Sequence, residues 1–464
     1  MATRAGTTTT QTTAPQDDPA GGRWVDGFAR VMERIVPDAL TTAIMLMVVL
    51  FVLALAVGNP VAATFDAYYR GLWSLLAFTM QMTLILVLSL ILGSTPFFRG
   101  AIVAVSRIPT SRVGVVSLAV LVGSFVAYLN WGLSIALSPI IGIHFAKEAE
   151  KKGIPIDFLF LLACLAGAGA IWQFGFSGSA PLLMATPGHF LEKTTGVMPL
   201  STTLWAPATI ALVLAFPMVC VFVGCVFMPK NVRPVSHFVE ASAAVEPVNY
   251  DVPPGLAFAQ RLEYNPLVLL PLSFMIAAWL YVHFFVKNLS LDINAVNTVV
   301  LLLGLLLHRT VFRFTRALKE AVALCWPIVL LYHVYAGVAG LIQFTSVGDF
   351  VVTLFDPILT AYSFPVLTVV TSTVVSFFIP TSGGQWLIQG LVTVKMADLV
   401  GLTAQRGLLA LSVGDHMGNL LTPFWAVVGA SVARIDFRAY VGYRMIFACL
   451  WFVMGVLAFT FLPC

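Results

Sequence analysis

Charged residues are scarce in this chain. Of its 464 residues, only 10% are Asp, Glu, Lys or Arg, whereas 59% are hydrophobic, and the mean hydropathy is +0.95. A soluble domain has roughly a quarter of its residues charged, so the composition excludes a soluble protein and predicts a polytopic membrane protein. The formal net charge of +4 is small and is spread over short loops, which argues against a nucleic-acid partner.

Cysteine motifs are absent as well. The six cysteines lie in or beside apolar runs and none of them forms a CxxC pair: Cys164, Cys220, Cys225, Cys325, Cys449 and Cys464. Neither a disulfide framework nor a zinc site is therefore expected. We interpret these cysteines as small hydrophobic residues.

The beginning of the chain lacks an apolar run. Residues 1–34 are rich in Thr, Gly and Pro over their first part, which predicts a disordered cytoplasmic tail and not a cleavable signal peptide. The first membrane span is then expected to act as the insertion signal.

Apolar runs dominate the rest of the sequence. Seven of them are close to the ~20 residues that a crossing needs: residues 37–58, 71–98, 203–228, 266–286, 293–308, 322–345 and 445–463. Four further stretches are interrupted by polar or helix-breaking residues. They are 113–146 with YLNWG, 157–187 with FGFSGSAP, 362–394 with PTSGGQ and 407–432 with GDHMGNLLTP.

Loop charges orient these segments, because Lys and Arg in short loops stay on the cytoplasmic side. Both flanks of 113–146 are basic, at Arg112 and Lys147, so this stretch is expected to enter and leave from the cytoplasm. It is too long for one crossing and too short for two, which predicts a re-entrant hairpin with its tip near Asn130. The loop 346–361 has no Lys or Arg, so 362–394 is expected to be a hairpin entered from outside.

The order of segments occurs twice, in opposite orientations. We expect an all-α polytopic membrane protein with inverted-topology repeats, each with a re-entrant hairpin and a broken transmembrane helix, as in secondary transporters. The expected parts are repeat 1 at 35–228 with hairpin 113–146, a cytoplasmic linker at 229–262, a linking helix at 263–289, and repeat 2 at 290–464 with hairpin 362–394.

The four polar breaks are the candidate binding site. Unpaired peptide groups are costly in lipid, so a break persists where it is buried in protein or lines a wet cavity. Isolated Gly and Pro also serve helix packing, but four breaks in matched positions indicate a site, with helix N-termini suited to a carboxylate. The candidate substrate-binding residues are Asn130, Trp131, Gly132, Ser177, Gly178, Ser179, Thr381, Ser382, Gly383, Gly384, Gln385 and Trp386. Of these, Trp131 and Trp386 are expected to form apolar walls.

Asp415 is an ionisable residue at membrane depth, in the segment LSVGDHMGNLLTPFW. Such residues carry ions or protons by default. We therefore assign Asp415 and Asn419 to a coupling cation, Na⁺ or H⁺, and expect no other cofactor. The alternative is that Asp415 caps the half-helix that follows it and pairs with His416.

Lys and Arg are absent from the centre of every expected span. A substrate carboxylate would then be held by hydroxyls, amides and helix ends, which suits one small anion better than a dicarboxylate. A different alternative comes from GFSG at 175–178, which matches the G-x-S-G pattern of an intramembrane serine protease, with His333 or His416 as the base.

Six blocks of sequence resemble one known family. They are GLWSLLAFTMQMTLIL at 71–86, LNWG at 129–132, GFSGSAPLLMATPG at 175–188, INAVNTVVLLLGLLLH at 293–308, PTSGGQWLIQG at 380–390 and MGNLLTPFWA at 417–426. In this order they resemble the bacterial short-chain fatty acid transporters of the acetoacetate-uptake type, within the ion transporter superfamily. The chain departs from the family pattern at Ser382–Gln385, where the family has three glycines and a His, and at Asp415–His416, where it has Glu-Gln.

The resemblance implies uptake of short monocarboxylates such as acetoacetate or butyrate across the bacterial inner membrane, by a fold of inverted repeats with re-entrant hairpins. Transporters of this superfamily are often homodimers, but the residues themselves leave the oligomeric state open. Membrane lipid is the expected surrounding. The alternatives are a dicarboxylate or other organic-anion carrier on the same fold, a channel, and the protease.

Overall fold

The computed structural model describes residues 39–243, 255–323, 325–436 and 438–464. Within these ranges the chain is built from helices and contains no strand, which confirms the all-α prediction. Six helical segments of this part are long and apolar enough to cross a membrane, and there are seven if α18 and α19, which are bent by 74° at their junction, are counted as one span. The predicted tail at 1–34 lies outside the described residues.

The first half of the chain contains these elements: α2 (Ala39–Ala56), α3 (Val61–Ser74), α4 (Leu76–Gly93), α5 (Pro96–Ser106), α6 (Arg112–Leu129), α7 (Trp131–Lys151), α8 (Phe158–Ala168), η1 (Gly169–Phe174), α9 (Ser179–Ala185), α10 (Glu192–Thr195), α11 (Leu200–Leu204), α12 (Pro207–Val226), η2 (Val235–His237) and α13 (Val239–Ala243).

The second half contains α14 (Phe258–Glu263), η3 (Pro266–Leu269), α15 (Leu270–Tyr281), η4 (Val282–Val286), α16 (Ile293–His308), α17 (Val311–Val322), α18 (Trp326–Phe344), α19 (Val347–Phe355), η5 (Asp356–Ile358), α20 (Ser363–Ser376), α21 (Ser382–Leu399), α22 (Ala404–Leu421), α23 (Pro423–Ala433) and α24 (Arg438–Phe461).

Most apolar runs became helices close to their predicted bounds, and α16 has the predicted bounds. The run predicted at 71–98 is different, because the apolar segment begins at Val61 and continues to Gly93. Its start was missed because Asp66 and Arg70 interrupt the hydrophobic pattern. The two side chains are four residues apart on α3, their closest atoms are 3.9 Å apart, and both are exposed.

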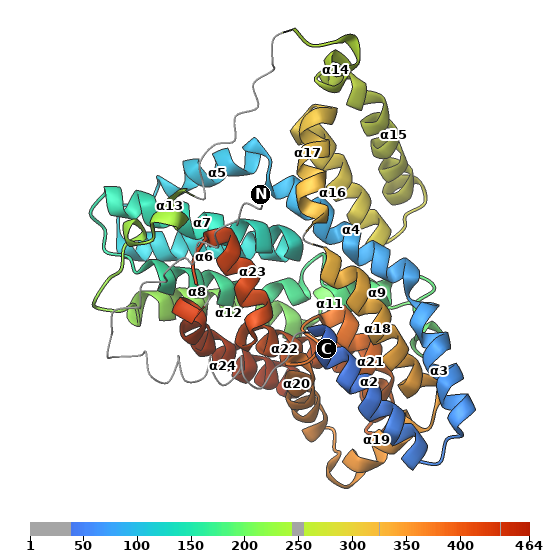
Figure 1. Ribbon diagram of the computed structural model, residues 1–464. Helices are drawn as coiled ribbons and strands as arrows, with labels where there is room; N and C mark the ends of the chain where they lie inside the picture. The colour runs from blue at the N-terminus through green and yellow to red at the C-terminus, as the bar shows by residue number, and fades with distance from the viewer. Residues whose placement is uncertain (1–38, 244–254, 324, 437) are drawn as a thin grey trace, which may run out of the picture.

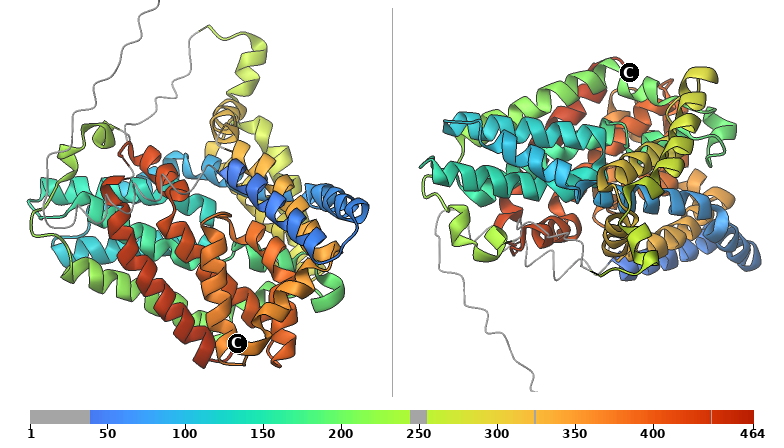
Figure 2. Two further views of the ribbon diagram at one scale, coloured as in Figure 1. Left: turned by 60° about the horizontal axis from the view of Figure 1, so that its bottom comes forward. Right: turned by 90° about the horizontal axis from the view of Figure 1, so that it is seen from above.

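Helices from the two halves are interleaved. Figures 1 and 2 show α6, α7, α8 and α12 on one side of the molecule together with α24, and α2 and α3 on the other side together with α18. On that second side, α3 and α18 cross where Gly71 meets Gly340. A Cβ built on Gly71 would lie 2.7 Å from the Cα of Gly340, so only small residues allow this backbone approach.

The segment from α8 to α9 passes through the middle of the bundle. Its apolar stretch is 89% buried, whereas that of Pro266–Val286, the predicted linking helix, is only 17% buried and lies at the margin. Because protein surrounds α8, η1 and α9, the backbone can leave the helical path between Phe174 and Ser179 without exposing peptide groups to lipid.

The break predicted at GDHMGNLLTP is much shorter than expected. The helix α22 continues through Asp415 and ends at Leu421, so the interruption before α23 is confined to Thr422. Gly414 and Gly418 do not unwind the helix. They allow α22 to lie against Ser372 and Ser376 of α20, in the way that small residues pack membrane helices.

The two predicted hairpins correspond to pairs of helices. The helices α6 and α7 pack against each other and are joined at Asn130, and α20 and α21 also touch and are joined by residues 377–381. The re-entry of these pairs from opposite faces of the membrane, and the twofold relation of the repeats, stay predictions.

Candidate functional site

The breaks of the first half are bonded to each other and to the second half. The backbone N–H of Trp131, at the start of α7, donates to Ser177 Oγ over 2.8 Å. The backbone N–H of Gly383, in the first turn of α21, donates to Ser179 Oγ over 3.0 Å. The two serines thus connect the break before α9 with the beginnings of both α7 and α21.

A third bond joins the remaining break to the same centre. Trp425, at the start of α23, donates its indole N–H to the carbonyl of Pro380 over 2.7 Å. The four interruptions, which are far apart in sequence, therefore meet in one place.

Polar side chains cap the helices that begin at this centre. Asn130 Oδ1 accepts the backbone N–H of Leu133 at 2.9 Å and the hydroxyl of Ser89 at 2.7 Å. Thr381 Oγ1 accepts the backbone N–H of Gly384 at 3.0 Å. Such caps satisfy amide groups that have no partner within the helix, so they start α7 and α21 inside the bundle.

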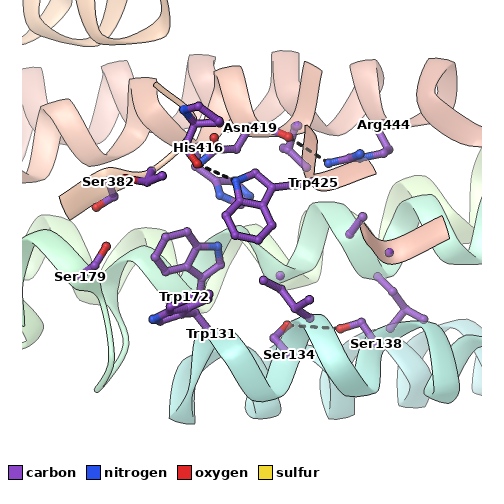
Figure 3. A pocket seen from close by; sticks show the side chains of 18 of the residues that line it. Trp131, Ser134, Ser138, Trp172, Ser179, Ser382, His416, Asn419, Trp425 and Arg444 are labelled. Atoms are coloured by element: carbon purple, nitrogen blue, oxygen red, sulfur yellow. Dashed lines mark hydrogen bonds between the residues drawn. The ribbon is translucent and has the colours of Figure 1, made fainter. Parts of the chain in front are cut away.

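A cavity of about 150 Å³ lies beside this junction (Figure 3). Aromatic and aliphatic side chains form most of its wall, and hydroxyl, amide and guanidinium groups interrupt it. Its lining residues are Trp131, Ser134, Ile135, Ser138, Pro139, Leu162, Leu165, Ala166, Gly169, Trp172, Ser179, Ile328, Leu331, Tyr332, Tyr335, Pro380, Thr381, Ser382, His416, Asn419, Leu420, Trp425, Gly429, Tyr440 and Arg444.

Three tryptophans form the middle of the wall. The ring of Trp131 lies 6.0 Å from that of Trp172 and 6.2 Å from that of Trp425, measured between centroids. Below them in Figure 3, the hydroxyls of Ser134 and Ser138 are 3.2 Å apart. These rings offer an apolar surface with hydroxyl groups at its edge.

The predicted substrate-binding residues divide into two groups. Four of them line the cavity: Trp131, Ser179, Thr381 and Ser382. The others lie behind the lining, in the caps and helix contacts that hold it: Asn130, Gly132, Ser177, Gly178, Gly383, Gly384, Gln385 and Trp386.

Gln385 and Trp386 show why sequence position alone did not place them. Both side chains are fully buried. Gln385 donates its amide to the carbonyl of Ser372 at 2.7 Å and to Gln389 Oε1 at 2.6 Å, so it ties α21 to α20. Trp386 packs against Gly390 of its own helix and, in this conformation, is not part of the cavity wall.

Asp415 lies inside α22 and does not cap a following helix, which corrects the cap alternative. Its Oδ2 accepts the amides of Gln173 at 2.5 Å and Asn419 at 2.9 Å, and its carbonyl accepts the hydroxyl of Ser376 at 2.7 Å. Gln173 belongs to η1, so this carboxylate joins the two broken segments. Asn419 lines the cavity, whereas Asp415 is completely buried behind it.

The wall of the cavity also includes a positively charged side chain that the sequence analysis did not assign to the site. Arg444 directly precedes the predicted span 445–463, a position typical of a basic flank, but it lies within α24 because this helix begins at Arg438. Its side chain is only 4% exposed and lines the cavity. The cavity wall thus includes a guanidinium beside the hydroxyls, amides and helix ends that the sequence predicted.

Other lining residues had weak signals in the sequence. Ser134 and Ser138 are four residues apart, and Tyr332 and Tyr335 are three apart, which places each pair on one face of a helix. Trp172 lies two residues before one break and Trp425 follows another. Each of these patterns also occurs in ordinary helix packing, so none of them singles out a site.

Two curated bacterial proteins resemble the chain along nearly its whole length. One from Escherichia coli strain K12 is 29% identical over 449 residues, which are 94% of this chain and 100% of that protein. One from Haemophilus influenzae is 28% identical over 437 residues, which are 92% of this chain and 97% of that protein. Both are provisionally named short-chain fatty acid transporters.

A solved membrane protein has a similar fold. The YdaH transporter of Alcanivorax borkumensis aligns with 91% of this chain and with 97% of its own length, with a TM-score of 0.50 and 13% sequence identity. At this identity the likeness concerns the fold alone.

The sequence profile described as "Short chain fatty acid transporter" matches residues 23–462. The family and the curated relatives are transporters and not enzymes, so the protease interpretation of GFSG is set aside. With its apolar helices, the chain is a multi-pass protein of the bacterial inner membrane. It belongs to the short-chain fatty acid transporter family.

Proposed function

We propose that this transporter carries short-chain monocarboxylates, such as butyrate or acetoacetate, by alternating access and in symport with Na⁺ or H⁺. The observation that carries the proposal is the cavity at the junction of the four breaks, where elements of both halves meet. In secondary transporters, broken helices from two repeats form the substrate site at such a place.

The size and the chemistry of the cavity fit a small amphipathic anion. A cavity of about 150 Å³ has room for a short acid. The tryptophans would contact the acyl chain, and the hydroxyls of Ser179 and Ser382 are available for a polar end. One buried cation in the described part of the wall favours a single carboxylate over a dicarboxylate.

The position of the cavity supports an inward-facing state. Its lining includes the second and third turns of α8, the first half of α18, the first two turns of α24, and the part of α7 that leads away from Asn130. Basic residues stand at the ends of these segments that lie away from the breaks: Lys151 and Lys152 at the junction of α7 and α8, Lys319 before α18 and Arg434 before α24. The loop charges therefore place all of these segments between the breaks and the cytoplasm. Release of the substrate into the cell would therefore begin from this conformation, and an outward-facing state would require the halves to shift.

Asp415 is the proposed site of coupling. A buried carboxylate that bridges the broken segments of the two halves can hold Na⁺ or a proton only while those segments stay together. Cation binding would then favour one of the two states of the transporter, which is what symport requires.

Uptake of labelled butyrate and acetoacetate into proteoliposomes tests this function, with sodium or proton gradients imposed separately. We expect accumulation against the substrate gradient with one of the two cation gradients, and competition by other short monocarboxylates. Empty liposomes are the control. No uptake of any monocarboxylate would refute the proposal, competition by dicarboxylates alone would support the organic-anion carrier, and flux without accumulation would indicate a channel.

A further inference from the structure

Arg444 is a buried cation whose guanidinium lacks part of the hydrogen bonds and the opposite charge that would replace its hydration. Its Nη2 donates to the carbonyl of Asn419 over 3.0 Å, whereas neither Nε nor Nη1 has a hydrogen-bond partner among the described residues. Burying a charge costs several kcal/mol unless an opposite charge and hydrogen bonds replace its hydration. In this structure, the guanidinium has obtained only part of that replacement.

The contacts that it does make give Arg444 a structural role. Asn419 lies in the last turn of α22, where backbone carbonyls have no partner within the helix and the dipole end is negative. The guanidinium carbon also lies 5.7 Å from the centre of the Tyr440 ring. These contacts hold the side chain in place but supply no full negative charge.

Acidic side chains of the cavity wall do not supply the missing negative charge. No Asp or Glu occurs among the described residues of the cavity wall. The buried carboxylate of Asp415 accepts hydrogen bonds from Gln173 and Asn419 and has no hydrogen bond with Arg444. A carboxylate ligand in the cavity would supply this negative charge and accept from Nε and Nη1 of Arg444.

We propose that Arg444 binds the carboxylate of the substrate, an inference that rests on the proposed function and names the anchor within that site. Figure 3 shows Arg444 at one end of the cavity, Ser179 and Ser382 at the other, and the tryptophans between them. A monocarboxylate held at Arg444 would lay its acyl chain along Trp425 and Trp131. Acids with a second polar group would place it near Ser382, whose hydroxyl has no hydrogen-bond partner in the described structure.

The same geometry links the anion to the proposed cation site. Asn419 accepts from Arg444 through its backbone carbonyl and donates to Asp415 through its side-chain amide, at 3.0 Å and 2.9 Å. A carboxylate that pulls the guanidinium toward the cavity acts on the last turn of α22, on which Asp415 also depends. Asn419 is therefore a positioning residue between the two sites.

The test measures ligand binding to the purified protein, through the thermal midpoint and equilibrium binding of labelled butyrate. Butyramide, the neutral analogue of butyrate, probes the carboxylate. We compare the wild type with Arg444→Gln and Arg444→Lys, and with Arg438→Gln as the control, because Arg438 is an exposed arginine of the same helix. We expect Arg444→Gln to weaken butyrate binding at least tenfold, because it removes a charge-assisted contact. Arg438→Gln should bind as the wild type does, and butyramide should bind weakly to every form.

The outcomes separate this inference from the proposed function. Wild-type affinity for butyrate in Arg444→Gln, or equal wild-type affinities for butyrate and butyramide, would overturn the role of Arg444 while transport stands. If Arg444→Gln does not fold, Arg444→Lys decides, because it keeps the charge and can keep the bond to Asn419. In Arg444→Lys, tighter binding of butyrate than of butyramide would support the proposal, and equal affinities for the two would overturn it. Failure of the wild type to bind or transport any monocarboxylate would refute the proposed function itself.

Discussion

Two buried ionisable residues, Asp415 and Arg444, differ in their position relative to the cavity wall. Arg444 lines it, whereas Asp415 lies one layer behind and is hydrogen-bonded to Asn419, which lines it. This separation would keep the two opposite charges from neutralising each other directly. It also leaves each charge available for a ligand of its own, an anion at Arg444 and a cation at Asp415.

Asp415→Asn should abolish accumulation driven by a cation gradient. The amide keeps the size of the side chain but cannot bind Na⁺ as an anion or carry a proton, so coupling is lost while the fold is kept. The measurement is butyrate accumulation in proteoliposomes, with exchange of labelled for unlabelled butyrate measured in parallel. Asp398→Asn, at an exposed carboxylate of α21, is the control. Full accumulation in Asp415→Asn would reduce Asp415 to a structural residue.

At the scale of the element, the contact between α20 and α22 fixes the position of the helix that carries Asp415 and Asn419. Gly414 and Gly418 bring the two helices close enough for Ser372 and Ser376 to donate their hydroxyls to carbonyls of α22, at 3.0 Å and 2.7 Å. One of these carbonyls belongs to Asp415 itself. The small residues therefore fix both the packing of α22 and the position of its carboxylate.

Gly414→Ala should destabilise the protein by about 1–3 kcal/mol, the usual cost of overpacking. A Cβ at this position would overlap Ser372 and lie 2.9 Å from the backbone nitrogen of Thr373, so the two helices must separate. Gly100→Ala is the matched control, because a Cβ built on this helical glycine meets nothing within 4 Å. The thermal midpoints in detergent compare the two variants. Equal midpoints would contradict the packing role given to Gly414.

At the scale of the whole molecule, the two halves meet around one cavity. The bond from Gln173 to Asp415 and the bond from Gly383 to Ser179 both join residues more than 200 positions apart. A movement of either half would therefore displace residues at the cavity directly. The inward-facing assignment depends on this arrangement together with the loop charges.

Labelling of an introduced cysteine can test that assignment. Ser138→Cys places a thiol on the cavity wall, and in the inward-facing state it should react with a membrane-impermeant maleimide added from the cytoplasmic side of vesicles. Butyrate should slow the reaction by occupying the cavity. Thr360→Cys, in the exposed loop before α20, should react only from the opposite side. Reaction of Ser138→Cys from the outside alone would reverse the assigned state.

The sequence by itself determined the class of the protein and the segments that matter. Hydropathy identified the helices because lipid admits only long apolar ones, and the polar breaks at Asn130, Ser177 and Thr381 were visible because such residues are rare at that depth. The resemblance found in six blocks agreed with the family that the comparisons show.

Only the tertiary structure decided which side chains face the cavity and which hold its wall. Gln385 and Trp386 stand in a polar break and yet are buried between helices, because helix rotation is set by packing that local sequence does not encode. Arg444 had the pattern of a loop charge, since a basic residue near a span end is ordinarily solvated there. Its placement in the cavity, and the pairing of Asp415 with a residue of the other half, follow from contacts between segments distant in sequence.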